Sequence, residues 1–377
     1  MAATVCIWAR AIGYPEGGGH LWAYLNWALG FRSCGCEVIW LEQVPSGIPA
    51  RRLQQRIAGL KSRLEPYGVG ENIAIYIEGE DSLPADLGDF ALDVDATAAR
   101  ADLLVDITYA TRDEVVSRFR RSALIDIDPG LTQLWISNGQ FRLAQHDFYF
   151  TVGENIGTPG ARVPDCSLFW NYTPPCVALP WWPVREALPT SPYTTVSQWL
   201  ADEWVVDGDD SYENNKRAGF LPFLSLPKST GAALELALPL GEDDRERKFL
   251  EGLGWSVVGA LDVSSTPWDY QRYIQLSRGE FSCAKPSCVR LQNAWISDRT
   301  ICYLASGKPA VVQDTGPSQI LPDAEGLLRF QTIEDALARL EEVEGNYRRH
   351  CKAARALAED VFDAQKVARK LLEHCLH

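Results

Sequence analysis

Short apolar runs alternate with segments of helical periodicity along most of this chain. In the first third, the apolar runs are Thr4–Trp8, Cys36–Leu41 and Asp102–Thr108. Between the first two runs, apolar side chains such as Leu21 and Leu25 recur at helical spacing. Parallel strands need a crossover connection, usually a helix, so this rhythm predicts a parallel, doubly wound sheet.

The chain is long enough for two such sheets. It has 377 residues, and a single core rarely grows beyond about 250–300 residues. The segment Trp170–Pro183 is rich in proline, which cannot donate to a strand ladder, so this segment is not a central strand. We therefore predict an α/β fold with two Rossmann-like parallel-sheet domains, an N-terminal one in residues 1–185 and a C-terminal one in residues 186–350.

The composition limits the classes of partner. A formal net charge of −14 argues against nucleic acid or an anionic membrane as the main partner, because both need a basic surface. No run approaches the roughly 18 consecutive apolar residues of a membrane span, and the sequence enters its first strand without a charged leader. The ten cysteines form no Cys-x-x-Cys pair, so we expect free thiols in a reducing cytoplasm and no metal site.

A glycine triplet precedes a histidine after the first predicted strand. Gly18 and Gly19 would let the backbone approach a ligand closely. His20 falls in the first turn of the following helix, where the helix dipole favours a neutral imidazole, as a general base requires. The spacing is not the GxGxxG dinucleotide pattern. The alternative for His20 is a capping or surface histidine.

The segment Ser277–Gly316 has the pattern of strand, loop, helix and strand. Ser297 and Asp298 form a helix N-cap signal, and Gly307 with Pro309 ends the helix. An apolar run and a polar turn follow. In a parallel sheet, ligands bind outside the carboxyl ends of the strands, which is where this helix would begin.

A helix N-terminus at that edge suits a phosphate, because it presents unpaired N–H groups and a partial positive charge. The residues expected around such an anion lie in the loop, the first helical turn or the last turn: Lys285, Ser297, Asp298, Arg299, Thr300, Asp314, Thr315 and Gly316. Lys216 or Arg217 could also reach a phosphate, although a solvated surface is the favoured interpretation for both. The alternative for the whole segment is a capped helix between two strands, with Arg299 in solvent.

The motifs SRGEFS, a following lysine, SDR and QDTG occur in this order. In this the chain resembles the GT-B glycosyltransferases. It is similar in particular to bacterial CgeB-like and glycosyltransferase family 1-like proteins, most strongly over residues 193–330. The resemblance implies two domains facing a cleft, with the last helix, in residues 351–377, packed back on the N-terminal domain.

The same resemblance implies a reaction, the transfer of a sugar from a nucleoside diphosphate sugar to an acceptor hydroxyl. A UDP-sugar is the favoured co-substrate, no metal or other cofactor is implied, and the acceptor and the oligomeric state stay open. The phosphate-site residues given above, together with Gly18 and Gly19, would bind this donor. In inverting members a histidine after the first strand deprotonates the acceptor, and an aspartate at a later strand end orients it. His20 matches the histidine and Asp106 the aspartate, with Asp126 and Asp128 as alternates.

Two departures from the family pattern leave the mechanism open. Many retaining members carry two glutamates where this chain has Ala294 and Cys302, and plant-type inverting members carry a histidine and a glutamate there. Inversion follows if His20 is the base, and a retaining mechanism remains otherwise. The alternatives in other classes are a sugar-nucleotide epimerase or hydrolase on the same fold, and a non-catalytic sugar-nucleotide or glycan-binding protein.

Overall fold

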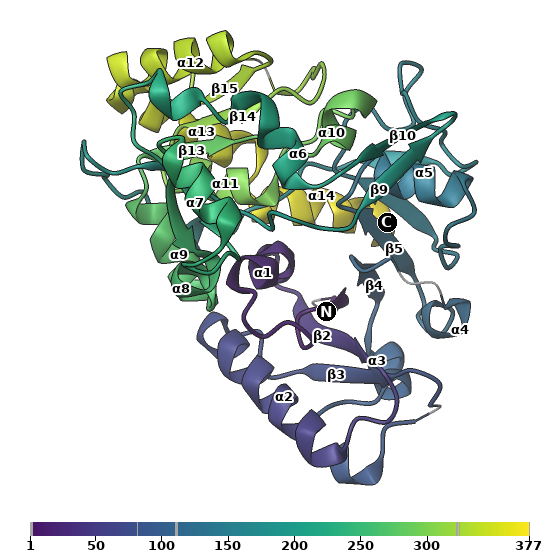
Figure 1. Ribbon diagram of the computed structural model, residues 1–377. Helices are drawn as coiled ribbons and strands as arrows, with labels where there is room; N and C mark the ends of the chain where they lie inside the picture. Colours follow the sequence, from purple (N-terminus) through teal and green to yellow (C-terminus); the bar gives the residue numbers. More distant parts are fainter. Residues whose placement is uncertain (1–2, 81, 110–111, 322, 324, 377) are drawn as a thin grey trace.

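The computed structural model describes residues 3–80, 82–109, 112–321, 323 and 325–376. Its described strands form two parallel sheets and one small hairpin. Figure 1 shows the sheets in separate halves of the molecule, with helix α1 (Gly18–Ser33) between them. The predicted α/β class with two Rossmann-like sheets is confirmed.

Within the described part of the chain, the first sheet has seven parallel strands in the order β3-β2-β1-β4-β5-β6-β7. Along β1, Val5 and Ile7 join one apolar cluster while Cys6 and Trp8 join another, so both faces of the sheet are covered. The strands are β1 (Thr4–Ala9), β2 (Glu37–Val44), β3 (Ile73–Ile77), β4 (Leu103–Asp106), β5 (Ser122–Asp126), β6 (Phe148–Thr151) and β7 (Trp170–Tyr172). The helices besides α1 are α2 (Ala50–Leu64), α3 (Val94–Arg100), α4 (Asp113–Val116) and α5 (Leu131–Ser137).

The second sheet has six parallel strands among the described residues, in the order β12-β11-β8-β13-β14-β15. Its strands are β8 (Tyr193–Val196), β11 (Leu234–Leu238), β12 (Ser256–Gly259), β13 (Gly279–Ser282), β14 (Ala310–Gln313) and β15 (Leu327–Phe330). Its helices are α6 (Lys216–Phe220), α7 (Arg245–Gly252), α8 (Ala260–Ser264), α9 (Pro267–Leu276), α10 (Pro286–Leu291) and α11 (Asp298–Ala305). The strand order places β8, β13 and β14 side by side at the centre.

Three helices end the chain and return it to the first sheet. These are α12 (Ile333–Gly345), α13 (Tyr347–Val361) and α14 (Ala364–Leu376). α13 packs on α11 of the second half, and α14 packs on α1. Between α13 and α14, the backbone of Val177 forms hydrogen bonds with Phe362 and Ala364. These bonds hold the segment where the chain crosses back to the first half.

The two halves meet closely around α1. The indole Nε1 of Trp22 donates to the Pro267 carbonyl at 2.8 Å, and its ring lies 4.8 Å from that of Trp182. The Trp182 ring also meets Tyr270 of α9, at 6.2 Å. Because Trp22 and Trp182 are fully buried, this contact is part of the core and not a loose interface.

The structure departs from the sequence prediction in two short elements. The sequence pattern predicts no strand in the polar segment Asp207–Arg217, but a hairpin forms at its start, of β9 (Trp204–Asp207) and β10 (Asp210–Glu213). The two-residue turn Gly208-Asp209 explains it, since a glycine at the first turn position readily takes the positive φ of +62° found there. α10 lies in a predicted loop. It starts at Pro286, a favoured first helical residue, and is too short for a periodic signal.

Candidate functional site

His20 lies in the first turn of α1, beyond the carboxyl end of β1, as predicted. Its Nε2 is 2.7 Å from the Arg10 carbonyl oxygen. A carbonyl only accepts, so Nε2 carries the hydrogen and a neutral ring keeps its lone pair on Nδ1. The ring lies between Tyr14 and Tyr24, with centroids 5.8 and 5.2 Å away, and the side chain is exposed. An exposed imidazole held in this orientation can take a proton from a substrate through Nδ1.

Glu42, which the sequence reasoning missed, holds the loop that orients His20. This fully buried carboxylate accepts from Ala11 N at 2.9 Å and Ile12 N at 3.2 Å. It also accepts from the Trp40 indole at 2.7 Å. Burial raises the pKa of Glu42 to about 7, although these donors lower it. A lone glutamate within the apolar run after Cys36 was the available signal, since a buried charge needs partners.

Asp106 ends β4 and is fully buried. Its Oδ1 accepts from Thr108 N and Oγ1, both at 2.7 Å. Its Oδ2 lies 3.2 Å from His146 Nε2, and His146 Nδ1 contacts the Ala144 carbonyl at 2.9 Å. These contacts tie Asp106 to the first half's own core, while the His20 ring is held by a backbone carbonyl. The role of Asp106 in orienting His20 stays a prediction.

The two alternate aspartates follow β5. Asp126 is buried and accepts from Thr132 Oγ1 at 2.7 Å and Thr151 Oγ1 at 2.9 Å, so it binds several elements together. Asp128 is half-buried, and the Tyr109 hydroxyl lies 3.2 Å from it. Burial raises the pKa of Asp128 to about 6, and the charge of Lys285 opposes the rise. Asp128 is thus close enough to the second half to sense its cations.

In the second half, Ser297 caps α11 as predicted. Its Oγ accepts from Arg299 N at 3.2 Å. A small cavity lies over this helix N-terminus, lined by Thr300, the end of β13 and the end of β14. The first-turn N–H groups other than that of Arg299 therefore face this cavity at the carboxyl edge of the sheet.

The predicted cations of this edge differ in their surroundings. Arg299 is buried, and its guanidinium contacts Glu280 at 2.9 Å and the Val196 carbonyl at 3.0 Å. Burial lowers its pKa, but the Glu280 charge, the hydrogen bond to Glu280 and the nearby Tyr270 and Tyr303 together raise it, so the pKa stays above the ordinary value. The alternative interpretation, which placed Arg299 in solvent, is therefore wrong. Lys285 is half-buried and pairs with Glu203 at 2.6 Å.

Lys216 corrects the prediction of a solvated surface. Its side chain is buried at the start of α6, where Nζ donates to the Cys283 carbonyl at 2.7 Å. Nζ also lies 5.6 Å from the centre of the Trp295 ring. Burial, together with the Arg299 charge, lowers the pKa of Lys216 to about 7. Cys283 and Trp295 both line the cavity over α11, so a buried ammonium stands beside the helix N-terminus.

The turn after β14 lies on the same side. Asp314 accepts from Gly316 N at 3.0 Å, and Thr315 Oγ1 donates to the Trp295 carbonyl at 2.7 Å. Gly316 has φ of +123°, and a Cβ there would lie 2.7 Å from the Gln292 carbonyl oxygen. The glycine is therefore required by backbone packing, whatever else it contacts.

Gly18 and Gly19, predicted to bind the donor, lie against the second half of the molecule. A Cβ on Gly18 would lie 2.1 Å from the Thr266 carbonyl oxygen, and one on Gly19 would lie 2.7 Å from the Tyr270 ring. Their small size allows α1 and α9 to pack closely. The contacts found for them are between the two halves of the protein.

The described residues hold neither a metal-binding cluster nor a membrane-spanning helix. Residues 3–376, apart from the gaps given above, contain no group of three or more His, Cys, Asp or Glu side chains that could hold a metal ion. Over the same described range, no helix combines the length and apolarity that crossing a membrane requires.

No protein family model matches the sequence, and no curated protein matches it significantly. Solved structures do match along the full length. Sucrose-phosphate synthase from Thermosynechococcus elongatus is 12% identical, covers 99% of this chain and 98% of that chain, and has a TM-score of 0.55. Anabaena HepE in complex with UDP and glucose is 12% identical, covers 99% of each chain, and has a TM-score of 0.57.

An alpha-glucosyltransferase in complex with UDP is 10% identical over 100% of both chains, with a TM-score of 0.61. Identities this low concern the fold alone. The chain therefore has the GT-B fold, the pair of Rossmann-like domains found in these glycosyltransferases.

Proposed function

We propose that the protein is a glycosyltransferase that moves a sugar from a nucleoside diphosphate sugar to an acceptor hydroxyl. The observation that carries the proposal is the buried ammonium of Lys216 beside the N-terminus of α11. Among the described residues no carboxylate pairs with Lys216. Burying a lysine in this way is costly, and a bound diphosphate would offset that cost. The similar structures with UDP or UDP-glucose support the same assignment.

The diphosphate would bind the first-turn N–H groups of α11, with Ser297 and Thr300 as further donors and Lys216 and Lys285 as cations. Arg299, which is buried beneath the site, would act on the diphosphate through its charge and not by direct contact. The donor sugar would lie near Asp314–Gly316. Preorganised dipoles and cations of this kind stabilise a leaving diphosphate without a catalytic metal. We propose a UDP-sugar, in particular a UDP-hexose, as the donor.

His20 is the proposed general base, acting through Nδ1 while the Arg10 carbonyl holds Nε2–H. This gives an inverting reaction, with Asp106 as the proposed support of that region. A retaining mechanism is the alternative. The resemblance to bacterial CgeB-like proteins and the free cysteines support a bacterial, cytoplasmic enzyme. The net charge argues against nucleic acid as acceptor, although one similar alpha-glucosyltransferase is in complex with a 13-mer DNA.

The test begins with thermal shift against UDP, TDP, GDP and ADP, with and without magnesium. UDP is expected to stabilise the protein without metal. UDP-glucose turnover is then followed with an acceptor panel, in the wild type and in His20→Ala. A transferase loses turnover in the variant while keeping UDP binding. No shift with any nucleotide would contradict the donor site.

A non-catalytic sugar-nucleotide-binding protein is the second candidate. It is favoured by Cys302, which stands where many retaining relatives have a glutamate. Its Sγ is buried, 3.2 Å from the Asp298 carbonyl and 3.9 Å from Asn26 Nδ2, so it contributes no charge to the cleft. UDP binding with no turnover toward any acceptor, and none of UDP-glucose hydrolysis, would favour this candidate.

A further inference from the structure

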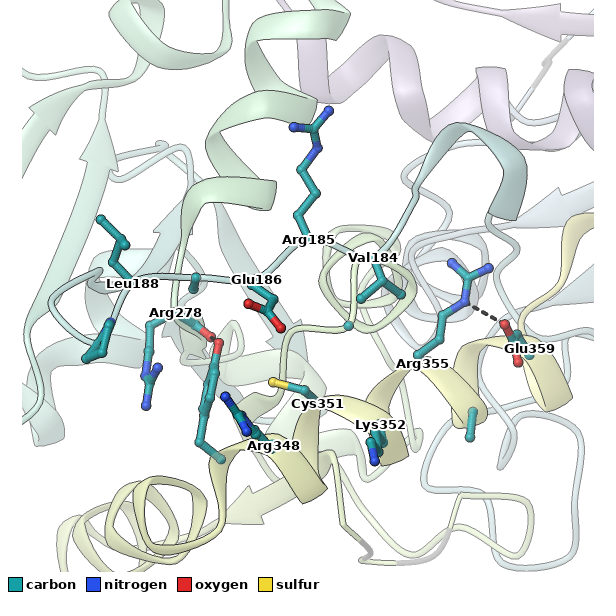
Figure 2. Close-up of a pocket in the computed structure, with 15 residues that line it drawn as sticks. Val184, Arg185, Glu186, Leu188, Arg278, Arg348, Cys351, Lys352, Arg355 and Glu359 are labelled. Carbon is teal, nitrogen blue, oxygen red and sulfur yellow. Dashed lines mark hydrogen bonds and ion pairs between the residues drawn. The ribbon is translucent and has the colours of Figure 1, made fainter.

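A second, larger cavity lies away from the donor edge. It occupies about 780 Å³ between α13 and the interdomain linker, defined here as residues 183–192. This volume is typical of small-molecule sites. Figure 2 shows the linker passing over α13, with Glu186 facing Arg348 and Cys351 across the gap.

The cavity is lined with more cations than carboxylates. The cations are Arg185, Arg278, Arg348, Lys352 and Arg355, and the carboxylates are Glu186 and Glu359. Arg278 pairs with Glu344 outside the cavity, and Arg355 pairs with Glu359. Among the described residues, no carboxylate pairs with Arg185, Arg348 or Lys352. A local excess of positive charge on a chain of net charge −14 marks a site for an anion.

Lys308 lies behind this wall, next to Gly307, which lines the cavity. It is fully buried, and within the described residues its Nζ has no hydrogen-bond partner. Burial lowers its pKa to about 8, and the charges that act on it come from Cys351, Arg278 and Glu186. Cys351 lies on α13, Arg278 directly precedes β13 and Glu186 lies in the linker, and all three line the cavity. A buried polar group without a partner is costly unless something else satisfies it.

The rest of the lining is apolar. Val184 and Leu188 of the linker are 53% and 70% exposed, and Ala356 of α13 lines the same cavity. A ligand with both a charged and an apolar part would match these surfaces. Arg348 and Lys352, which have no carboxylate partner among the described residues, and Lys308 behind them face one opposing glutamate, Glu186 (Figure 2), and this excess favours a dianion over a monoanion.

We propose that this cavity binds a small phosphate monoester with an apolar or ring-shaped body, at a site separate from the donor cleft. The phosphate lies near Lys308, Arg348 and Lys352, and the body lies on Val184 and Leu188.

The cavity is also connected to the donor edge through α11. The Arg355 guanidinium donates to the carbonyls of Trp182 and Ala305, at 2.9 and 2.7 Å. The linker amide of Arg185 donates to the Ser306 carbonyl at 3.3 Å. Eight helical residues span about 12 Å, so the cavity borders one end of α11 and the proposed diphosphate site the other.

The binding is tested by calorimetry on the full chain with phenyl phosphate, inorganic phosphate, benzoate and benzyl alcohol. Phenyl phosphate is expected to bind at least 10-fold more tightly than the other three, with and without saturating UDP. The double variant Arg348→Glu, Lys352→Glu is expected to weaken phenyl phosphate at least 10-fold. Arg51→Glu, an equally exposed charge reversal on α2, is the matched control and leaves it unchanged.

Absence of phenyl phosphate binding, displacement by UDP, or equal affinity in the double variant would overturn the proposal. UDP is titrated alone in parallel. Binding of phenyl phosphate without binding of UDP would refute the proposed function and support the cavity proposal. Binding of UDP without binding of phenyl phosphate would refute the cavity proposal alone.

Discussion

Replacing Lys216 by methionine is expected to stabilise the free protein while weakening nucleotide binding. Its pKa of about 7, against 10.5 for an ordinary lysine, means that burial of the charge opposes folding. A difference of about 3.5 pKa units corresponds to about 5 kcal/mol. Losing the hydrogen bond to the Cys283 carbonyl costs about 1–3 kcal/mol, so the unfolding free energy of the variant rises by about 2–4 kcal/mol at pH 7.

The pH dependence has a defined sign. The folded-state pKa of Lys216 is lowered, so between pH 7 and 10.5 the unfolded chain binds more protons than the folded one. Wild-type stability therefore gains about 1.4 kcal/mol per pH unit from this residue as the pH rises through that window. Lys216→Met removes this contribution.

Nucleotide binding should change in the opposite direction. A hydrogen bond to a charged group contributes about 1.5–3 kcal/mol, so UDP is expected to bind about 10- to 150-fold more weakly. At pH 8 most of Lys216 is neutral in the free protein, and UDP binding takes up close to one proton. Calorimetry in two buffers of different ionisation enthalpy measures that uptake, and the variant loses it.

Urea denaturation at pH 7 and 9 measures the stability change, with Lys61→Met, an exposed lysine on α2, as control. A less stable Lys216→Met protein that binds UDP with wild-type affinity and proton uptake would refute the reasoning. Lys216 would then be a structural residue, and the anion site would lie elsewhere.

Three further outcomes are expected. His20→Ala lowers the transfer rate at least 100-fold with UDP affinity within about twofold, whereas an unchanged rate would exclude it as the base. Gly18→Ala, whose Cβ would meet the Thr266 carbonyl, lowers the unfolding free energy by about 1–3 kcal/mol. The control Gly59→Ala, in open space on α2, raises it by up to about 1 kcal/mol, and equal shifts in melting temperature would contradict the packing argument. Glu42 has a raised folded-state pKa, so between pH 4.5 and 7 the folded protein binds more protons than the unfolded chain. As the pH rises through this range, the unfolding free energy of the wild type falls by up to about 3 kcal/mol relative to that of Glu42→Gln. A constant difference across that range would contradict this.

Local signals were sufficient for much of the fold. The N-cap at Ser297 and the stop at Gly307, with φ of +69°, both occur as predicted, because cap chemistry depends on a few adjacent residues. The hairpin around Gly208 was missed because each of its strands buries one side chain, Val205 or Tyr212, which is too few for an alternating pattern.

The site was harder to predict, because its residues come together only through the tertiary fold. His20 could be placed, since a strand end and a helix start define it. The partner of Arg299 is Glu280, nineteen residues earlier on β13, and no spacing rule connects the two. Lys216 looked solvated in a polar run, and its burial depends on Cys283 and Trp295 from other loops.

The central claim is the location of the donor site, and a crystal structure with UDP tests it most directly. We predict the β-phosphate within hydrogen-bond distance of the first-turn amides of α11 and of Lys216 Nζ. UDP bound away from α11, or a protein that takes up no UDP at millimolar concentration, would contradict the account.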